Sequence, residues 1–102
     1  PTIYITENGV CDNTEPDANG DINDTTRIDL LGKFLAGLHG AIHEGCDVRG
    51  YYQWSLMDNF EWAFGFSKRF GIIHTNFETL KRTPKKSAAW YADVIRRNGV
   101  EA

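Results

Sequence analysis

Two strand-like segments, each followed by a helical pattern, leave few folds open to this chain. The first, Thr2–Thr6, is short, β-branched and apolar and is bounded by Pro1 and by Asn8–Gly9, which fits a strand buried on both faces. The second, Val48–Leu56, is dense in the aromatic residues that suit a pleated surface. Because the crossovers are long enough to join parallel neighbours, the order predicts two βα units.

The helical patterns have clear start and stop signals. Asp24 can cap the first helix and Gly45 can end it. Its apolar residues recur at helical spacing: Ile28, Leu31, Leu35, Leu38 and Ile42. We expect the second helix to open with Thr83 as N-cap and Pro84 at the first helical position, and to end at Asn98–Gly99. Its predicted buried stripe consists of Tyr91, Val94 and Ile95.

The length of the chain selects among α/β folds. A (β/α)8 barrel needs about 250 residues, so 102 residues hold roughly a quarter of one. An independent doubly wound domain would need more strands. The chain also begins at Pro1 without an initiator Met or a signal-peptide pattern, so we expect a piece of a longer protein. The predicted fold class is α/β, a partial TIM barrel.

Composition narrows the possible partners. The longest apolar run, 88–92, is far too short for a membrane helix, so no membrane partner is expected. The net charge is −3. Six acidic residues stand unopposed before Arg27: Glu7, Asp12, Glu15, Asp17, Asp21 and Asp24. The later cations are spaced by turns, which favours a solvated surface over nucleic-acid binding: Lys68, Arg69, Lys81, Arg82, Lys85 and Lys86.

Neither a metal nor a cofactor is indicated. Cys11 and Cys46 lack metal-ligand spacing and are interpreted as free buried thiols of a reducing, cytoplasmic compartment. His39 and His43 share a helix face, but without further ligands they are interpreted as solvent-facing.

Two places could carry chemistry, because functional groups of α/β folds lie where strands end. Glu7 follows the first strand directly, which suits a nucleophile or general base but equally a salt-bridged or capping residue. Beyond Trp54, the aromatic loop 57–70 mixes carboxylates with aromatic rings. Such a mixture suits sugars, whose hydroxyls bind carboxylates and whose C–H faces stack on rings, although the rings could be ordinary core.

The same residues resemble the family 1 glycoside hydrolases, the β-glucosidase family. Ile5–Gly9 (ITENG) is similar to the nucleophile motif of that family, and Trp54–Trp62 (WSLMDNFEW) is similar to its signature after the last barrel strand. The match continues, in the right order, over nearly the whole chain: Gly20-x-Ile22-x-Asp24-x-x-Arg27–Ile28, Arg69–Phe70–Gly71 and Lys81–Arg82-x-Pro84–Lys85-x-Ser87.

The resemblance implies the C-terminal quarter of the barrel, with strands seven and eight. Residues 1–47 would form the seventh βα unit, and residues 48–102 the eighth, with its long aromatic loop. Glu7 would be the nucleophile of a retaining β-glucosidase-type hydrolase. The implied sugar-binding residues are Trp54, Glu61, Trp62 and Phe70, with Asn8 and Gly9 as motif support.

The chain lacks one part of that machinery. The family takes its general acid/base from an Asn-Glu-Pro sequence on an earlier strand, which is absent here, and Glu15 of Thr14–Glu15–Pro16 is not expected to replace it. The 102 residues alone are therefore expected to be inactive. The expected partners are a β-glucoside or oligosaccharide and the remainder of the barrel, with self-association through uncovered strand edges. A non-catalytic carbohydrate-binding role and a merely structural, self-associating role remain the alternatives.

Overall fold

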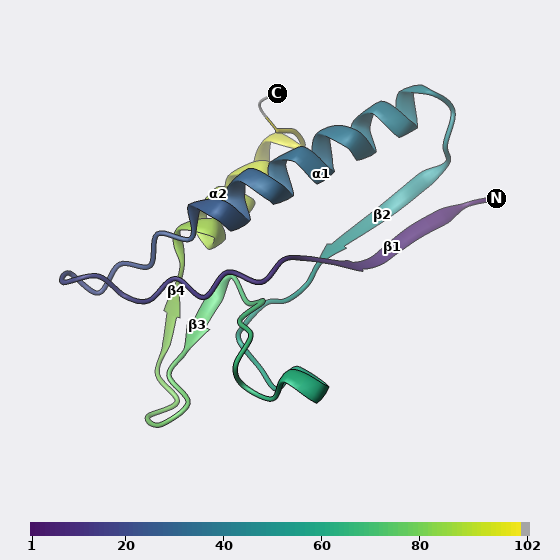
Figure 1. Cartoon of the computed structure of the whole chain (residues 1–102). Helices are drawn as coiled ribbons and strands as arrows, with labels where there is room; N and C mark the ends of the chain where they lie inside the picture. Colours follow the sequence, from purple (N-terminus) through teal and green to yellow (C-terminus); the bar gives the residue numbers. More distant parts are fainter. Residues whose placement is uncertain (101–102) are drawn as a thin grey trace.

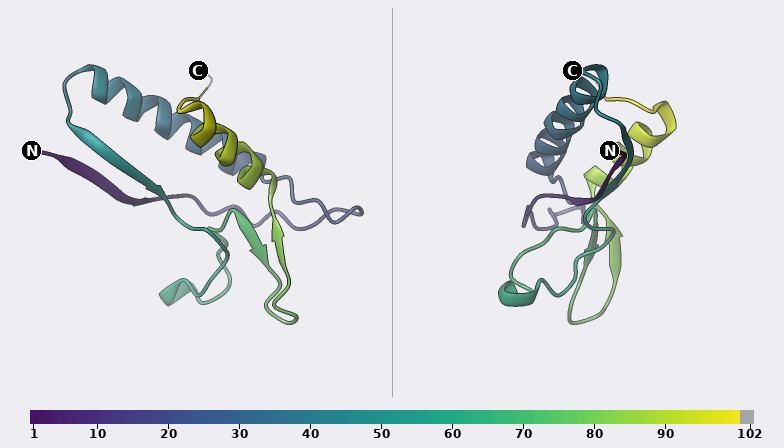
Figure 2. Two further views of the ribbon diagram at one scale, coloured as in Figure 1. Left: turned by 180° about the vertical axis from the view of Figure 1, so that it is seen from behind. Right: turned by 90° about the vertical axis from the view of Figure 1, so that its right-hand side faces the viewer.

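The computed structural model describes residues 1–100 and places a parallel strand pair beside two helices and a small hairpin (Figures 1 and 2). Its elements, in chain order, are β1 (Ile3–Asn8), α1 (Thr25–His43), β2 (Val48–Gln53), the short 3-10 helix η1 (Trp62–Phe64), β3 (Ile73–Thr75), β4 (Arg82–Pro84) and α2 (Lys86–Arg97). Strand β1 pairs in parallel with β2, and β3 pairs antiparallel with β4. The predicted order of two strands, each followed by a helix, is therefore confirmed.

The second strand is shorter than predicted. It was expected to reach Leu56, but β2 ends at Gln53. From Ser55 on, the chain pairs with the segment before β3: the Ser55 amide donates to the Phe70 carbonyl (3.0 Å), and the Ile72 amide donates to the Ser55 carbonyl (3.0 Å). These bonds to residues far along the chain outweigh the local strand preference of the sequence.

The start of α2 was also predicted wrongly. Thr83 and Pro84 are not the cap and first turn of the helix, because residues 82–84 form β4, and the helix begins at Lys86. The Lys85 amide donates to the Ile72 carbonyl (2.9 Å), and the Lys85 side chain is buried. These contacts hold the chain extended where a proline-led helix signal would otherwise start a turn.

The apolar faces of the strands are uncovered in the described residues. Strand β1, predicted to be buried on both faces, is mostly exposed, because β2 is its single pairing partner in residues 1–100. Ile95 of the predicted α2 stripe is likewise 63% exposed, whereas Val94 is buried. The radius of gyration is 14.7 Å, larger than the roughly 13 Å of a compact domain of this length. Parallel strands are normally covered on both faces, so the open shape agrees with a partial barrel.

The cysteines are not the buried thiols that were expected. Cys46 is exposed, just after α1, and Cys11 is half-buried. Both are free. Cys46 follows Gly45 in the turn that leads to β2, and the apolar layer that would cover such a thiol is absent from residues 1–100. No helix in this described range is long and apolar enough to cross a membrane.

Buried charge links the two helices at their N-termini. Asp24 stands at the N-cap position of α1 but makes no capping bond. Its fully buried carboxylate instead pairs with Arg27 and accepts from the Ser87 amide (2.9 Å) and hydroxyl (2.5 Å). Asp24, one of the six acidic residues that precede Arg27 in the sequence, is therefore paired with Arg27 itself. A count of charges along the sequence cannot reveal the contact with Ser87, because Ser87 is uncharged and lies 63 residues from Asp24.

Replacing Ser87 tests this link. Ser87→Ala removes the hydroxyl that donates to buried Asp24, and an under-bonded buried acceptor costs about 1–3 kcal/mol. We expect denaturant unfolding to show a free-energy loss of that size. The neighbouring Lys86→Ala is the control, because Lys86 is exposed and should change stability by less than about 0.5 kcal/mol. Equal effects of the two variants would contradict the role given to Ser87.

Candidate active site

The two candidate site segments meet where β1 and β2 end. The Trp54 amide donates to the Asn8 carbonyl (2.7 Å), so the backbones stay bonded beyond the last residue of β2. A Cβ atom at Gly9 would lie 1.9 Å from the Trp54 carbonyl oxygen. The oxygen belongs to the backbone and the Cβ is fixed to its Cα, so neither can move aside as the end of a flexible side chain could. Gly9 is therefore required by this close approach, which gives its predicted supporting role a physical basis.

Asn8 is held by a contact toward the helices. The Tyr51 hydroxyl donates to Asn8 Oδ1 (2.8 Å), and Tyr51 lines a groove with Leu35 of α1 and Tyr91 of α2. The register of β1 against β2 shifts between Ile5 and Asn8, which interrupts the regular alternation of side chains along the strand. Glu7 lies within this irregular stretch and is exposed.

Tyr51 holds its proton firmly. Burial, with a smaller contribution from nearby Tyr91, raises the pKa of Tyr51 to about 12. The hydroxyl is therefore protonated at neutral pH and available as the donor to Asn8.

The predicted sugar-binding residues lie on the segment that follows β2. The Trp54 indole Nε1 donates to Glu61 Oε1 (2.9 Å), so these two predicted residues touch. Trp62 begins η1 with a positive φ of 46° and is largely exposed. Phe70 ends the aromatic loop, and its carbonyl accepts from the amide of Ser55, two residues after β2.

The rings of the aromatic loop are not core of the described residues. Phe60, Phe64 and Phe66 are each more than half exposed. Phe66 packs against Phe77 with ring centroids 4.5 Å apart. In Figures 1 and 2, η1 lies at the tip of a loop that extends away from both helices.

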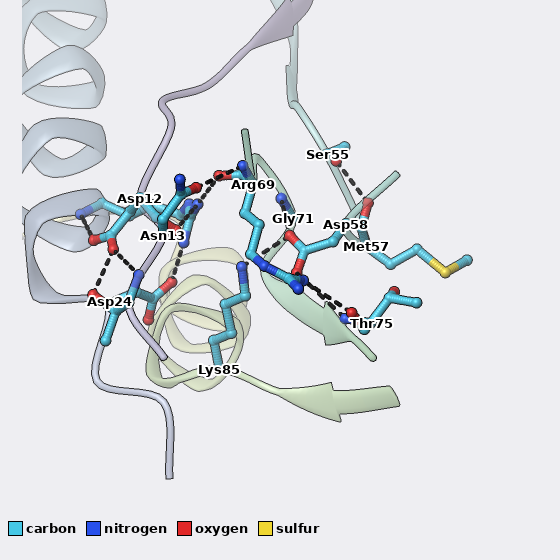
Figure 3. Close-up of polar contacts among 12 residues, drawn as sticks. Asp12, Asn13, Asp24, Ser55, Met57, Asp58, Arg69, Gly71, Thr75 and Lys85 are labelled. Carbon is cyan, nitrogen blue, oxygen red and sulfur yellow. Dashed lines mark hydrogen bonds and ion pairs between the residues drawn. The ribbon is translucent and has the colours of Figure 1, made fainter. Parts of the chain in front are cut away.

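The base of this loop is held by a buried carboxylate that sequence reasoning missed (Figure 3). Asp58 accepts from Lys85 Nζ (2.9 Å) and Arg69 (2.6 Å), and also from the backbone amides of Gly71 (3.0 Å) and Thr75 (3.3 Å). We call these five residues the Asp58 cluster. The side chains of Asp58 and Lys85 are fully buried, and that of Arg69 is 15% exposed.

The cluster corrects the prediction of a solvated cationic surface for Arg69 and Lys85. Burial opposes the charge on Asp58, but hydrogen bonds from Lys85 and Arg69 outweigh it, and the pKa of the carboxyl lies below its ordinary value. Burial also lowers the pKa of Lys85, against the effect of its bond to Asp58. The sequence held one sign that these two cations differ from surface residues. Both fall within the motifs that extend the resemblance to family 1, Arg69–Phe70–Gly71 and Lys81–Ser87.

The structure identifies no metal centre in residues 1–100. No group of three or more His, Cys, Asp or Glu side chains there could hold an ion. His39 and His43 lie edge to face on α1, with ring centroids 4.5 Å apart, and both are exposed.

Glu7 was predicted to follow the first strand, but β1 extends to Asn8, so the carboxylate lies near the end of the strand and not beyond it. A carboxylate near the end of one parallel strand and an aromatic, carboxylate-bearing loop after the next are typical of a (β/α)8-barrel enzyme that acts on sugars. The chain belongs to glycosyl hydrolase family 1, because the sequence profile of that family matches residues 1–100. It is 52% identical over 99 residues to beta-glucosidase A of Acetivibrio thermocellus, a match covering 97% of this chain and 22% of that protein.

Solved structures agree with the predicted barrel piece. The family 1 β-glucosidase from Thermotoga maritima in complex with isofagomine lactam superposes with a TM-score of 0.96 at 46% identity, covering 99% of this chain and 23% of that one. The chain therefore spans less than a quarter of the length of these relatives. A further relative, "Probable inactive beta-glucosidase 14" of Oryza sativa subsp. japonica, is 51% identical over 90 residues, which cover 86% of this chain and 17% of that protein.

His74, beside the Asp58 cluster, is buried as a neutral ring. Its Nε2 has no hydrogen-bond partner among the described residues. Burial and the positive charge of Arg69 lower its pKa, with Lys85 acting in the same direction and Asp58 and Glu15 opposing. The unfolded chain therefore binds a proton at His74 more readily than the folded chain does.

We therefore expect acid to destabilise the protein through His74. The stabilisation is fully present above the unfolded histidine pKa of about 6.5 and is lost as the pH falls toward the lower folded value. Unfolding free energies measured at about pH 8 and about pH 5.5 should differ less in His74→Gln than in the unmutated protein. His39→Gln, at an exposed site, should leave the difference unchanged. A His74→Gln variant with the original pH dependence would contradict this assignment.

Proposed function

We propose that this chain is the nucleophile-bearing part of a retaining β-glycosidase of β-glucosidase type. The observation that carries the proposal is the junction of β1 and β2, where Trp54 donates to the Asn8 carbonyl and its indole donates to Glu61. Glu7, one residue before Asn8, is exposed, and the segment after β2 carries an aromatic ring with a carboxylate bonded to it, which supports the proposal. Family membership and relatives named as β-glucosidases support the same activity.

Glu7 would act as the nucleophile. Its carboxylate oxygen attacks the anomeric carbon and forms a glycosyl-enzyme ester while the bond to the leaving oxygen breaks. A second carboxyl group, about 5–5.5 Å from Glu7, must protonate that oxygen and then activate the water that hydrolyses the ester. Because the motifs of this chain contain no carboxyl group suited to that acid/base role, the remainder of the barrel would supply it.

The aromatic loop would hold the sugar. Trp54 offers its indole face for stacking, and its Nε1 bond occupies Glu61 Oε1, which leaves Oε2 to accept from sugar hydroxyls. Trp62 lies beside Glu61, and Phe70 would wall the same pocket. The substrate is accordingly a terminal β-glucosyl residue, or a β-galactosyl or β-fucosyl one, of a glycoside or oligosaccharide. Cytoplasmic location and self-association of the isolated 102 residues remain predictions.

A non-catalytic, carbohydrate-binding role is the second candidate. The observation that favours it is the similarity to a relative named as probably inactive, which shows that an overall match over these residues can accompany such a name. Both candidates bind sugar through Trp54 and Glu61, so only turnover separates them.

Replacing Glu7 in the full-length protein separates the two candidates. We expect Glu7→Gln to lower kcat for a nitrophenyl β-glucoside by at least about a thousandfold, because the amide is a poor nucleophile. Glu15→Gln is the matched control, since Glu15 is also exposed and lies in the polar loop after β1. Full activity of Glu7→Gln would overturn the nucleophile assignment. Sugar binding without turnover by the unmutated protein would establish the binding role instead.

Glu61 should decide the substrate class. A carboxylate at this position repels a dianionic sugar phosphate by several kcal/mol at the effective dielectric near a protein surface, roughly 4 kcal/mol for one charge pair at 4 Å. We expect the full-length protein to prefer a nitrophenyl β-glucoside over its 6-phosphate in kcat/KM. Glu61→Ser should reduce that preference by about tenfold or more, whereas Glu78→Ser, at an exposed hairpin position, should not. Preference for the phosphate in the unmutated protein would contradict the role of Glu61.

A further inference from the structure

Asn13, five residues beyond β1, binds the returning end of the aromatic loop. Its Nδ2 donates to the Ser67 carbonyl (2.9 Å), and its Oδ1 accepts from the Arg69 amide (2.8 Å). The side-chain amide thus makes the two bonds, to alternate residues, that a neighbouring strand would make with its backbone. Figure 3 shows Asn13 and Asp58 on opposite sides of Arg69.

The bonds from Ser67 lead on to Glu61. The Ser67 amide (3.1 Å) and hydroxyl (2.6 Å) both donate to the Phe64 carbonyl. The Phe64 amide donates to the Glu61 carbonyl (2.9 Å), and the Glu61 amide donates to the Gly65 carbonyl (2.7 Å). An unbroken series of hydrogen bonds therefore connects Asn13 to Glu61.

Arg69 is anchored by contacts other than those of Asn13. Asn13 is exposed, and Arg69 is held separately by the buried Asp58 carboxylate and the Thr75 carbonyl (2.9 Å). The Arg69 carbonyl also accepts from the Asp12 amide (3.0 Å) and from Arg27 (2.7 Å). Asn13 in addition fixes the position of residues 67–69. These residues lie between the anchors of Arg69 and the exposed tip of the loop.

We propose that Asn13 is a positioning residue of the sugar site: it fixes the aromatic loop to the segment that leaves Glu7, and so sets the position of Glu61. The inference rests on the proposed function, because it acts through the hydroxyl contacts assigned to Glu61. Asn13 tunes how strongly the site distinguishes a sugar that carries the hydroxyl facing Glu61 from one that lacks it.

The test uses Asn13→Asp and Asn13→Leu in the full-length protein. Asp has the same shape and keeps the acceptor for Arg69, but it loses the donor to Ser67, whereas Leu loses both bonds. Asn19→Asp is the matched control, because Asn19 is an exposed asparagine of the same polar loop. Its backbone amide bonds to Asp17, and its side chain makes no hydrogen bond within residues 1–100.

The readout is the ratio of kcat/KM for a nitrophenyl β-glucoside to that for its 6-deoxy analogue. We expect both Asn13 variants to lower the ratio about three- to tenfold, the effect of one or two hydrogen bonds. The melting temperature should stay within a few degrees of the unmutated value. An unchanged ratio overturns the inference, whether or not the melting temperature falls. An equal loss in Asn19→Asp also overturns it.

A parallel measurement on Glu61→Ser separates failure of this inference from failure of the proposed function. If Glu61→Ser lowers the ratio and the Asn13 variants do not, the positioning role of Asn13 is wrong and the role of Glu61 stands. If Glu61→Ser leaves the ratio unchanged, the hydroxyl contact of Glu61 is itself wrong, and the inference falls with it.

Discussion

The ionic contact of Asp58 with Lys85 and Arg69 is the interaction on which the rest of this structure depends. It joins the segment after β2 to the hairpin and to the start of α2, through bonds spanning 11 to 27 residues. Removing one partner of such a buried pair typically costs about 3–5 kcal/mol, because the other charge is left without compensation. The Gly71 and Thr75 amides also donate to Asp58, and these bonds offset the free-energy cost of burying its charge.

Polar contacts therefore take the place of a large apolar core in residues 1–100. The buried apolar side chains there are Ile22, Leu31, Ile72 and Val94. The buried polar residues outnumber them and gather at the helix N-termini and the base of the aromatic loop, whereas the apolar faces of the strands stay open. The contacts at the loop base thus lie within residues 1–100, whereas the apolar faces of the strands are not covered there.

The sequence predicted what periodicity and chain order control. The strand β1, the helix α1 and the meeting of the two site segments, through Asn8 and Trp54, follow from apolar spacing and from the geometry of βα units. The late start of α2 and the burial of Lys85 did not follow, because both depend on Asp58, 27 residues earlier. Charge counts along a chain carry no information on which ions meet in space.

The candidate site depends in the same way on contacts between distant residues. The segment that carries Glu7 is held against the aromatic loop within this chain, by the Asn8 contacts to Tyr51 and Trp54 and by the Asn13 contacts to residues 67–69. Under the proposed function, the distance from Glu7 to an acid/base group would be set by how the open edges of β1 and β2 pair with other strands. Sugar recognition and nucleophile placement would then be encoded together in one short stretch, while protonation of the leaving group would depend on assembly of the whole barrel. A substitution at the loop base would accordingly alter selectivity among sugars, and one at the open strand edges would alter the chemical step.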